Sequence, residues 1–218
     1  MASIYDCSVE SELLTGMRLA RTAIGRGDLV VVPTDTVYGL AADAFNPRAV
    51  QKLIDAKGRS RQSPPPVLIP GIPTLDALAE SVPDVVRTLV AKYWPGGLTV
   101  ILNAQPSLIW DLGETRGTVA LRMPSHRIAL ELLSETGPLA VSSANLTGQP
   151  PATSAAAALE ALGERASIYL DGGEGGTVPS TIVDATGFSR PDGKLRIVRE
   201  GAIPSDEIRE LVGADLCE

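Results

Sequence analysis

A run of three valines that ends in a cluster of hydroxyl groups constrains the fold of this chain most. Residues 30–32 are all β-branched, which is the composition of a buried strand. A strand that ends in hydrogen-bond donors and acceptors can present a small polar ligand at the edge of a sheet. For this segment alone, a turn whose hydroxyls only cap backbone groups is the alternative. After Pro33, the cluster comprises Thr34, Asp35, Thr36 and Tyr38.

Short apolar runs and amphipathic segments alternate along the rest of the chain. Asn46 followed by Pro47 is a typical helix start, and Ser125 is a candidate cap for a later helix. Either Thr153 or Ser154 can cap the alanine-rich helix that follows them. Because no repeat or low-complexity linker divides the chain, we expect one α/β (or α+β) domain with a mixed sheet. Strands are predicted at 30–32, 67–69, 98–102, 118–122, 139–141, 168–170, 182–184 and 195–199, and helices at 11–24, 46–58, 83–93, 125–134, 154–162 and 205–212.

Composition and charge exclude several classes of function. The 218 residues carry a net charge of −7, which argues against a diffuse nucleic-acid-binding surface but leaves room for a local basic patch. A single histidine argues against a histidine-based zinc site or a Ser–His triad. Two cysteines near opposite ends form no disulfide framework, so we expect a reducing, cytoplasmic environment. We see no signal peptide and no apolar run of membrane-spanning length.

Cations and small polar residues follow several of the predicted strands and helices. Neither a G-x-x-x-x-G-K-[ST] loop nor a G-x-G-x-x-G loop is present, so the usual phosphate-binding loops are absent. Each cation taken singly is explained by solvated surface charge. If they converge, they form an anion pocket for phosphates and a carboxylate. The group comprises Lys57, Arg59, Arg122 and Arg199, with Ser142, Ser143, Asn145, Ser180 and Thr181 as the small polar residues.

Five segments of the chain resemble the YrdC-like family in sequence and in order. The resemblance covers about residues 10–201 and implies one YrdC-like domain over 1–218, without the additional C-terminal domain that some members carry. It also implies a twisted mixed sheet that curls around a cleft, with helices outside. The segments are 33–40 (PTDTVYGL), 56–59 (AKGR), 118–124 (TVALRMP), 142–148 (SSANLTG) and 179–184 (PSTIVD).

The resemblance implies an ATP-dependent enzyme. Its substrates would be L-threonine, bicarbonate (or CO2) and ATP, and its products threonylcarbamoyl-AMP and pyrophosphate. That product would serve a separate transferase that modifies tRNA, so contact with tRNA would be indirect or weak. Mg2+ would be held mainly by the ATP phosphates, since the sequence offers no dedicated set of carboxylates. The oligomeric state and any movement of residues 60–70 as a lid stay open.

The resemblance also implies a role for each matching residue. The set Lys-x-Arg and Ser-x-Asn would carry the chemistry and handle the triphosphate: Lys57, Arg59, Ser143 and Asn145. Further contacts to ATP are implied for Ser63, Thr118 and Arg199. The L-threonine contacts are implied for Thr36, Tyr38, Arg122, Ser142 and Ser180, with Arg122 pairing the carboxylate. His126 and both cysteines are expected to be structural or surface residues.

Two departures from the family pattern affect the threonine pocket and its loop. Ser63 stands where related sequences often carry Asn or Lys before a proline, and Leu68 stands where some relatives have a histidine. Two alternative functions remain open at this stage. One is a non-catalytic RNA-binding protein of the same fold, supported by the local basic group Lys52, Lys57, Arg59 and Arg61. The other is a carbamoyl-adenylate-forming domain that acts on another amine.

Overall fold

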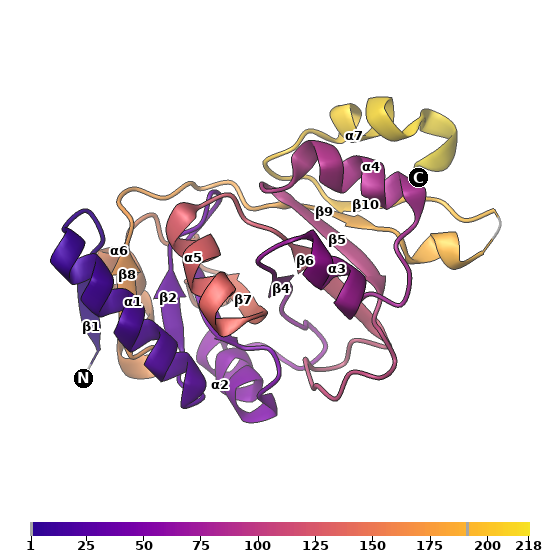
Figure 1. Cartoon of the computed structure of the whole chain (residues 1–218). Helices are drawn as coiled ribbons and strands as arrows, with labels where there is room; N and C mark the ends of the chain where they lie inside the picture. Colours follow the sequence, from indigo (N-terminus) through magenta and orange to yellow (C-terminus); the bar gives the residue numbers. More distant parts are fainter. Residues whose placement is uncertain (1, 191) are drawn as a thin grey trace.

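The computed structural model describes residues 2–190 and 192–218. Within these ranges the strands form one ten-stranded mixed sheet in the order β1-β8-β2-β3-β7-β4-β6-β5-β9-β10 (Figure 1). The α/β class and the mixed sheet predicted from the sequence are therefore confirmed. The strands are β1 (Ser3–Asp6), β2 (Val30–Val32), β3 (Gly39–Asp43), β4 (Val67–Leu68), β5 (Leu98–Asn103), β6 (Thr118–Arg122), β7 (Leu139–Ser143), β8 (Ile168–Asp171), β9 (Thr181–Asp184) and β10 (Arg196–Arg199).

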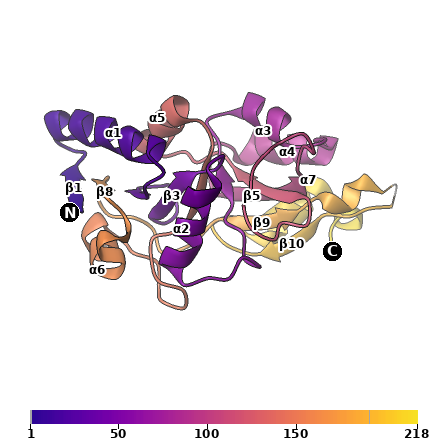
Figure 2. The same cartoon turned by 90° about the horizontal axis from the view of Figure 1, so that it is seen from below.

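Helices cover the sheet in three groups. Around β2, β3 and β8, one pair of helices packs on one face and a second pair on the other, as Figure 2 shows for α1 above and α6 below β8. A third group packs against β5, β6 and β9 at the other end of the sheet. The helices are α1 (Glu10–Gly25) with α5 (Arg127–Thr136), α2 (Pro47–Lys57) with α6 (Ala155–Leu162), and α3 (Ile72–Leu78), α4 (Asp84–Tyr93) and α7 (Ser205–Val212); short 3-10 turns lie at Gly163–Arg165, Thr186–Ser189 and Ala214–Leu216.

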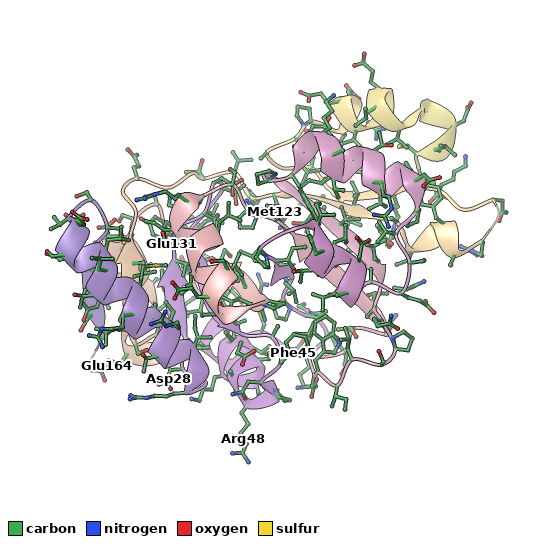
Figure 3. The ribbon with its side chains drawn as sticks, in the orientation of Figure 1. Asp28, Phe45, Arg48, Met123, Glu131 and Glu164 are labelled. Carbon is green, nitrogen blue, oxygen red and sulfur yellow. The ribbon has the colours of Figure 1, made fainter. Side chains whose placement is uncertain are left out.

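Local sequence signals place both ends of α2. The side chain of Asn46 accepts hydrogen bonds from the backbone N–H groups of Arg48 and Ala49, and Gly58 ends the helix in the left-handed conformation (φ 64°). Arg48, in the first turn, projects away from the molecule in Figure 3, whereas Lys57, in the last turn, is 1 % exposed. The C-terminus of α2 thus directs a lysine into the protein.

Four features differ from the sequence prediction. Strands β1 and β3 and helix α3 were not predicted, and the expected cap Ser125 does not cap α5. Helix α5 begins after His126 without a side-chain cap, and the backbone N–H of Ser125 instead donates to Asp35. Strand β3 is made of small residues, and a Cβ at Gly39 would lie 2.5 Å from a Val141 methyl carbon. Close approach of β7 therefore selects residues with low strand propensity.

Candidate functional site

A cavity of about 390 Å3 lies where several strands end. Its walls come from the turn between β2 and β3, the segment after α2, and the ends of β6, β7 and β10. Figure 3 marks this region by Met123, which directly follows Arg122 and lies between α5 and α4. Eight of the residues predicted from the sequence line it: Thr36, Arg59, Arg122, Ser142, Ser143, Asn145, Ser180 and Arg199.

Arg122 is held at all three guanidinium nitrogens. Its Nε donates to the carbonyl of Gly96 (2.9 Å), and its Nη1 donates to the Thr36 hydroxyl (2.8 Å). Its Nη2 forms an ion pair with Asp35 at 2.8 Å, and 7 % of its side chain is exposed. Burial lowers the pKa of Arg122, and the charge of Asp35 opposes that shift. The guanidinium is therefore oriented before any ligand arrives.

The hydroxyl of Thr36 has a defined hydrogen-bonding direction. Thr34 Oγ1 lies 2.7 Å from the carbonyl of Val37, which can only accept, so Thr34 uses its proton there. In the 3.2 Å contact between the two threonine hydroxyls, Thr36 must then be the donor. Because Thr36 Oγ1 also accepts from Arg122, it has one lone pair left. Towards a ligand, Thr36 can accept an N–H or O–H but cannot donate to a carboxylate.

Lys57 lies behind the wall of the cavity and supports the loop after β7. Its ammonium donates to the backbone carbonyls of Ser143 and Asn145 and to Asn145 Oδ1. Three acceptors match the three protons of an ammonium group. Burial, followed by the nearby charge of Arg59, lowers the pKa of Lys57 to about 7. The sequence placed Lys57 at the triphosphate; in the structure its donors are engaged by the wall.

Within the part of the chain that the structure describes, Arg59 and Arg199 donate only to neutral oxygens. Arg59 Nη1 donates to the Ser142 hydroxyl (3.2 Å), and Arg199 Nη2 donates to the carbonyl of Ser180 (2.7 Å). Partial burial lowers the pKa of Arg199, and the charges of Arg122 and Arg59 lower it further. All three arginines line the same cavity, which agrees with this effect of Arg122 and Arg59 on Arg199. An anion between them would be stabilised by all three.

Besides Lys57, three predicted site residues lie outside this cavity. Ser63 is exposed in the loop before β4, where its neighbour Pro64 lines the wall. Thr118 lines an adjacent hollow of about 250 Å3, which shares Pro64, Pro66 and Ile182 with the cavity. Tyr38 is buried, and its hydroxyl donates to the carbonyl of Gly173 (2.6 Å). The expected contact of Tyr38 with threonine therefore has no support in its position, because the ring points toward the turn after β8.

Tyr38→Phe is expected to lower stability by about 1–3 kcal/mol and to leave the KM for L-threonine within about twofold. The hydroxyl that is removed belongs to a buried ring and satisfies Gly172 N–H (3.1 Å) and Gly173 C=O in the turn after β8. Tyr169→Phe is a matched control, because Tyr169 is equally buried and its hydroxyl donates to a carbonyl, that of Gly163, at 2.6 Å. Chemical denaturation and steady-state kinetics check both variants. A threonine KM that rises only for Tyr38→Phe would restore the predicted contact.

The local basic group that supported an RNA-binding function is divided in the structure. Lys52 pairs with Asp28 (3.2 Å), and Arg61 pairs with Asp111. Lys57 is buried and Arg59 faces the cavity. These four side chains therefore do not form one basic surface, and the observation that favoured this alternative is lost.

Two residues at the site, Thr99 and Asp35, were not assigned a role from the sequence. Thr99 lies in the cavity wall, and its hydroxyl is 2.8 Å from that of Ser180. Its position within an apolar strand was the only available signal: a lone threonine in such a run faces either a partner or a ligand. Leu68, the departure noted above, also lines the cavity, so this part of the wall is apolar. Asp35, which lay within a recognised motif without a role, holds Arg122.

Neither a metal-binding cluster nor a membrane-spanning helix is found within residues 2–190 and 192–218. No group of three or more His, Cys, Asp or Glu side chains is placed to hold a metal ion. No helix in these ranges is both long enough and apolar enough to cross a membrane.

Relatives with known names match most of the length of this chain. A Mycobacterium tuberculosis protein, whose name gives threonylcarbamoyl-AMP synthase only provisionally, is 45 % identical over 99 % of this chain and 97 % of its own length. The threonylcarbamoyl-AMP synthase of Methylococcus capsulatus is 33 % identical over 78 % of this chain and 92 % of its own length. That of Bacillus subtilis is 38 % identical over 89 % of this chain, but only 56 % of its length is matched.

Solved structures and a family profile agree with these relatives. The crystal structure of Pyrococcus abyssi Sua5 complexed with L-threonine superposes with a TM-score of 0.86 at 33 % identity. That match covers all of this chain, which spans 62 % of the Sua5 chain. Escherichia coli YciO has the same fold, with a TM-score of 0.81 at 22 % identity over 94 % of this chain and 98 % of its own. The Sua5_yciO_yrdC family, described as "Telomere recombination", matches residues 22–201, and this chain is a member of that Sua5/YciO/YrdC family.

Proposed function

We propose that this protein forms threonylcarbamoyl-AMP from L-threonine, CO2 (or bicarbonate) and ATP, with release of pyrophosphate. The observation that carries the proposal is the cavity itself, where one buried, ion-paired arginine and two arginines without acidic partners meet among small hydroxyl groups. Such a site suits a carboxylate beside a polyphosphate. The relatives named threonylcarbamoyl-AMP synthase and the L-threonine in the Pyrococcus abyssi crystal support it.

L-Threonine would bind at the Arg122 end. Its carboxylate would accept a hydrogen bond from the guanidinium, and the free lone pair of Thr36 would accept an N–H or O–H of the substrate. The neutral amine attacks the carbon of CO2 and loses a proton, which forms a C–N bond and a carbamate. If bicarbonate is the source, the amine proton leaves with the hydroxyl group of bicarbonate as one water. The site has to position two small reactants, which does not require an activated nucleophile of the protein.

ATP would bind with its phosphates at the Arg59 and Arg199 end. We place its adenine in the adjacent, mostly apolar hollow that includes Thr118. A carbamate oxygen then attacks the α-phosphorus, a P–O bond forms, the bond to the β-phosphate breaks, and pyrophosphate leaves. The arginines would offset the charge of two anions brought together. Ser143 and Asn145 would contact the phosphates, and Lys57 would act through this loop by holding it in place.

Mg2+ would enter as part of the substrate, bound to the phosphates of ATP. The residues fit this source, because the cavity wall carries arginines and hydroxyls, with Asp35 already engaged by Arg122. The product would be consumed by a separate transferase that modifies tRNA, so tRNA itself would not need to enter the cavity. We propose a cytoplasmic location, because the transferase that would consume the product acts on tRNA.

Pyrophosphate release with and without L-threonine, in bicarbonate and Mg2+, tests the proposal. We expect release to depend on threonine and to give a product with the mass of threonylcarbamoyl-AMP. The same assay with serine in place of threonine, or with carbamoyl phosphate in place of bicarbonate, tests the alternative that this domain acts on another amine. Threonine-independent release, or a faster reaction with another amine, would contradict the proposed substrate.

A further inference from the structure

Asp35 links Arg122, which lines the cavity, to the backbone of Ser125 through one carboxylate oxygen. Its Oδ1 lies 2.8 Å from Arg122 Nη2 and accepts the backbone N–H of Ser125 at 2.9 Å. Only 17 % of its side chain is exposed. The carboxylate therefore joins the turn after β2 to the segment between β6 and α5. It is held there by contacts on both sides, not by solvent.

The ion pair leaves part of Arg122 available. Nη2 is close to Asp35, but it is a buried atom without an aligned hydrogen-bond partner among the described residues. Nη1 uses one proton on Thr36 and has a second. The second proton of Nη1 can therefore be donated to a further acceptor, while Nη2 stays buried beside Asp35. Asp35 thus balances the charge of Arg122 and leaves this donor of Nη1 for a ligand.

The pairing gives the cavity two electrostatically different ends. At one end, Asp35 balances the charge of Arg122. At the other end, Arg59 and Arg199 donate only to the neutral oxygens of Ser142 and Ser180. A ligand at the Arg122 end meets a carboxylate as well as a cation. The repulsion from that carboxylate grows in proportion to the ligand's negative charge.

We propose that Asp35 is a specificity-determining residue, which reserves the Arg122 end for a single carboxylate and keeps polyphosphate out of it. This inference rests on the proposed function, because it assumes that threonine and ATP share the cavity. The single carboxylate of an amino acid is repelled only weakly by Asp35, and it meets a guanidinium that is already oriented. A triphosphate with three or four negative charges is directed to Arg59 and Arg199 instead. Without Asp35, three equivalent arginines would let phosphate compete for both ends.

Asp35→Asn tests this, with tripolyphosphate as the probe. Asparagine keeps an oxygen for Ser125 N–H and removes the charge. In the unmodified protein, we expect tripolyphosphate to compete with ATP and not with L-threonine. In Asp35→Asn, tripolyphosphate should also compete with threonine. Its inhibition constant with respect to threonine should be at least about tenfold lower in this variant than in the unmodified protein. Asp35→Glu should restore the exclusion, since it restores the charge.

Asp184→Asn is the matched control. Asp184 also pairs with an arginine, Arg196 at 2.9 Å, and 16 % of its side chain is exposed, but it lies outside the cavity wall. We expect it to leave the inhibition pattern unchanged. If Asp35→Asn does not fold, as judged by its melting curve, Asp35→Ser removes the same charge with a smaller side chain.

Calorimetric titration of tripolyphosphate without substrates separates this inference from the proposed reaction. It requires no turnover, so it reports on the charge of the Arg122 end even if threonine proves not to be the substrate. We expect tighter or additional binding to Asp35→Asn. If tripolyphosphate binds this variant as it binds the unmodified protein, and threonine kinetics stay insensitive to it, the role of Asp35 is overturned.

Discussion

Replacement of Arg122 by alanine is expected to lower kcat/KM for L-threonine by about 100-fold or more, with a change of less than about threefold in the KM for ATP. The guanidinium is fixed by Gly96, Thr36 and Asp35, so it meets the carboxylate of threonine without reorganising. Loss of a charge-assisted hydrogen bond and of its buried cation accounts for the size of the effect. Pyrophosphate release at varied threonine and varied ATP measures both constants.

Two comparisons make this expectation specific. Arg196→Ala removes an arginine–aspartate pair of the same kind from outside the cavity, and it should leave both constants unchanged. The amide of L-threonine lacks the carboxylate, so the unmodified protein should discriminate against it and Arg122→Ala should lose that discrimination. If the KM for ATP rises instead and threonine use is unaffected, Arg122 does not bind the amino acid.

Replacement of Lys57 by alanine should weaken the use of ATP more than the use of L-threonine. It should also lower the free energy of unfolding. It leaves two carbonyls and one amide oxygen of the 143–145 segment without their donor inside the wall. We expect a loss of about 3 kcal/mol and at least a tenfold rise in the KM for ATP, with a smaller change for threonine. Lys57→Met keeps the apolar stem without the donors, so it should retain more stability than alanine and still lose ATP use.

The pH dependence of stability provides an independent check on Lys57. Its pKa is about 7 in the folded protein, whereas a lysine in the unfolded chain keeps its proton to about 10.4. Between these values the unfolded state binds one more proton, so this residue makes stability rise with pH, by up to about 1.4 kcal/mol per unit. Chemical denaturation from pH 7 to 9 should show this slope, and Lys57→Met should lack it. An identical pH dependence in both proteins would show that Lys57 is not held as described.

The range from pH 7 to 9 lies mostly below the pH at which Cys7 makes an opposing contribution to stability. Burial raises the pKa of the Cys7 thiol to about 11, while an unfolded cysteine titrates near 8.5. There the folded state binds the extra proton, so stability contributed by Cys7 falls as pH rises from about 9 towards 11. The difference between the unmodified protein and Lys57→Met cancels this effect, since both contain Cys7.

Elements with a strong apolar period could be predicted from the sequence, and those shaped by neighbouring strands could not. Helix α2 has its own cap, its own apolar face and its own terminating glycine, so its limits follow from local residues. Strand β3 has none of these signals, because it lies between β2 and β7 and three of its five residues are glycine or alanine. Its structure depends on partners that lie far away in the sequence, such as Val141.

The wall of the cavity was predicted better than the direction of each side chain in it. Arg59, Arg122 and Arg199 follow ordered elements, so their meeting could be inferred once the motifs were taken together. Tyr38 lies within the same motif as Thr36, yet its ring turns toward the segment after β8, where its hydroxyl bonds the backbone of Gly172 and Gly173. Burial raises the pKa of Tyr38 above its usual range, which keeps that hydroxyl protonated.

The sequence by itself determined which chemical groups are present, which elements carry them, and that a carboxylate and a polyphosphate are plausible ligands in one acidic protein. Only the tertiary structure decided which donors are free. Lys57 is bound by oxygens 86 and 88 residues away, and Asp35 by a backbone N–H 90 residues away. The physical reason is that a buried polar group must find a partner, and that partner is supplied by the fold and not by neighbours in the chain.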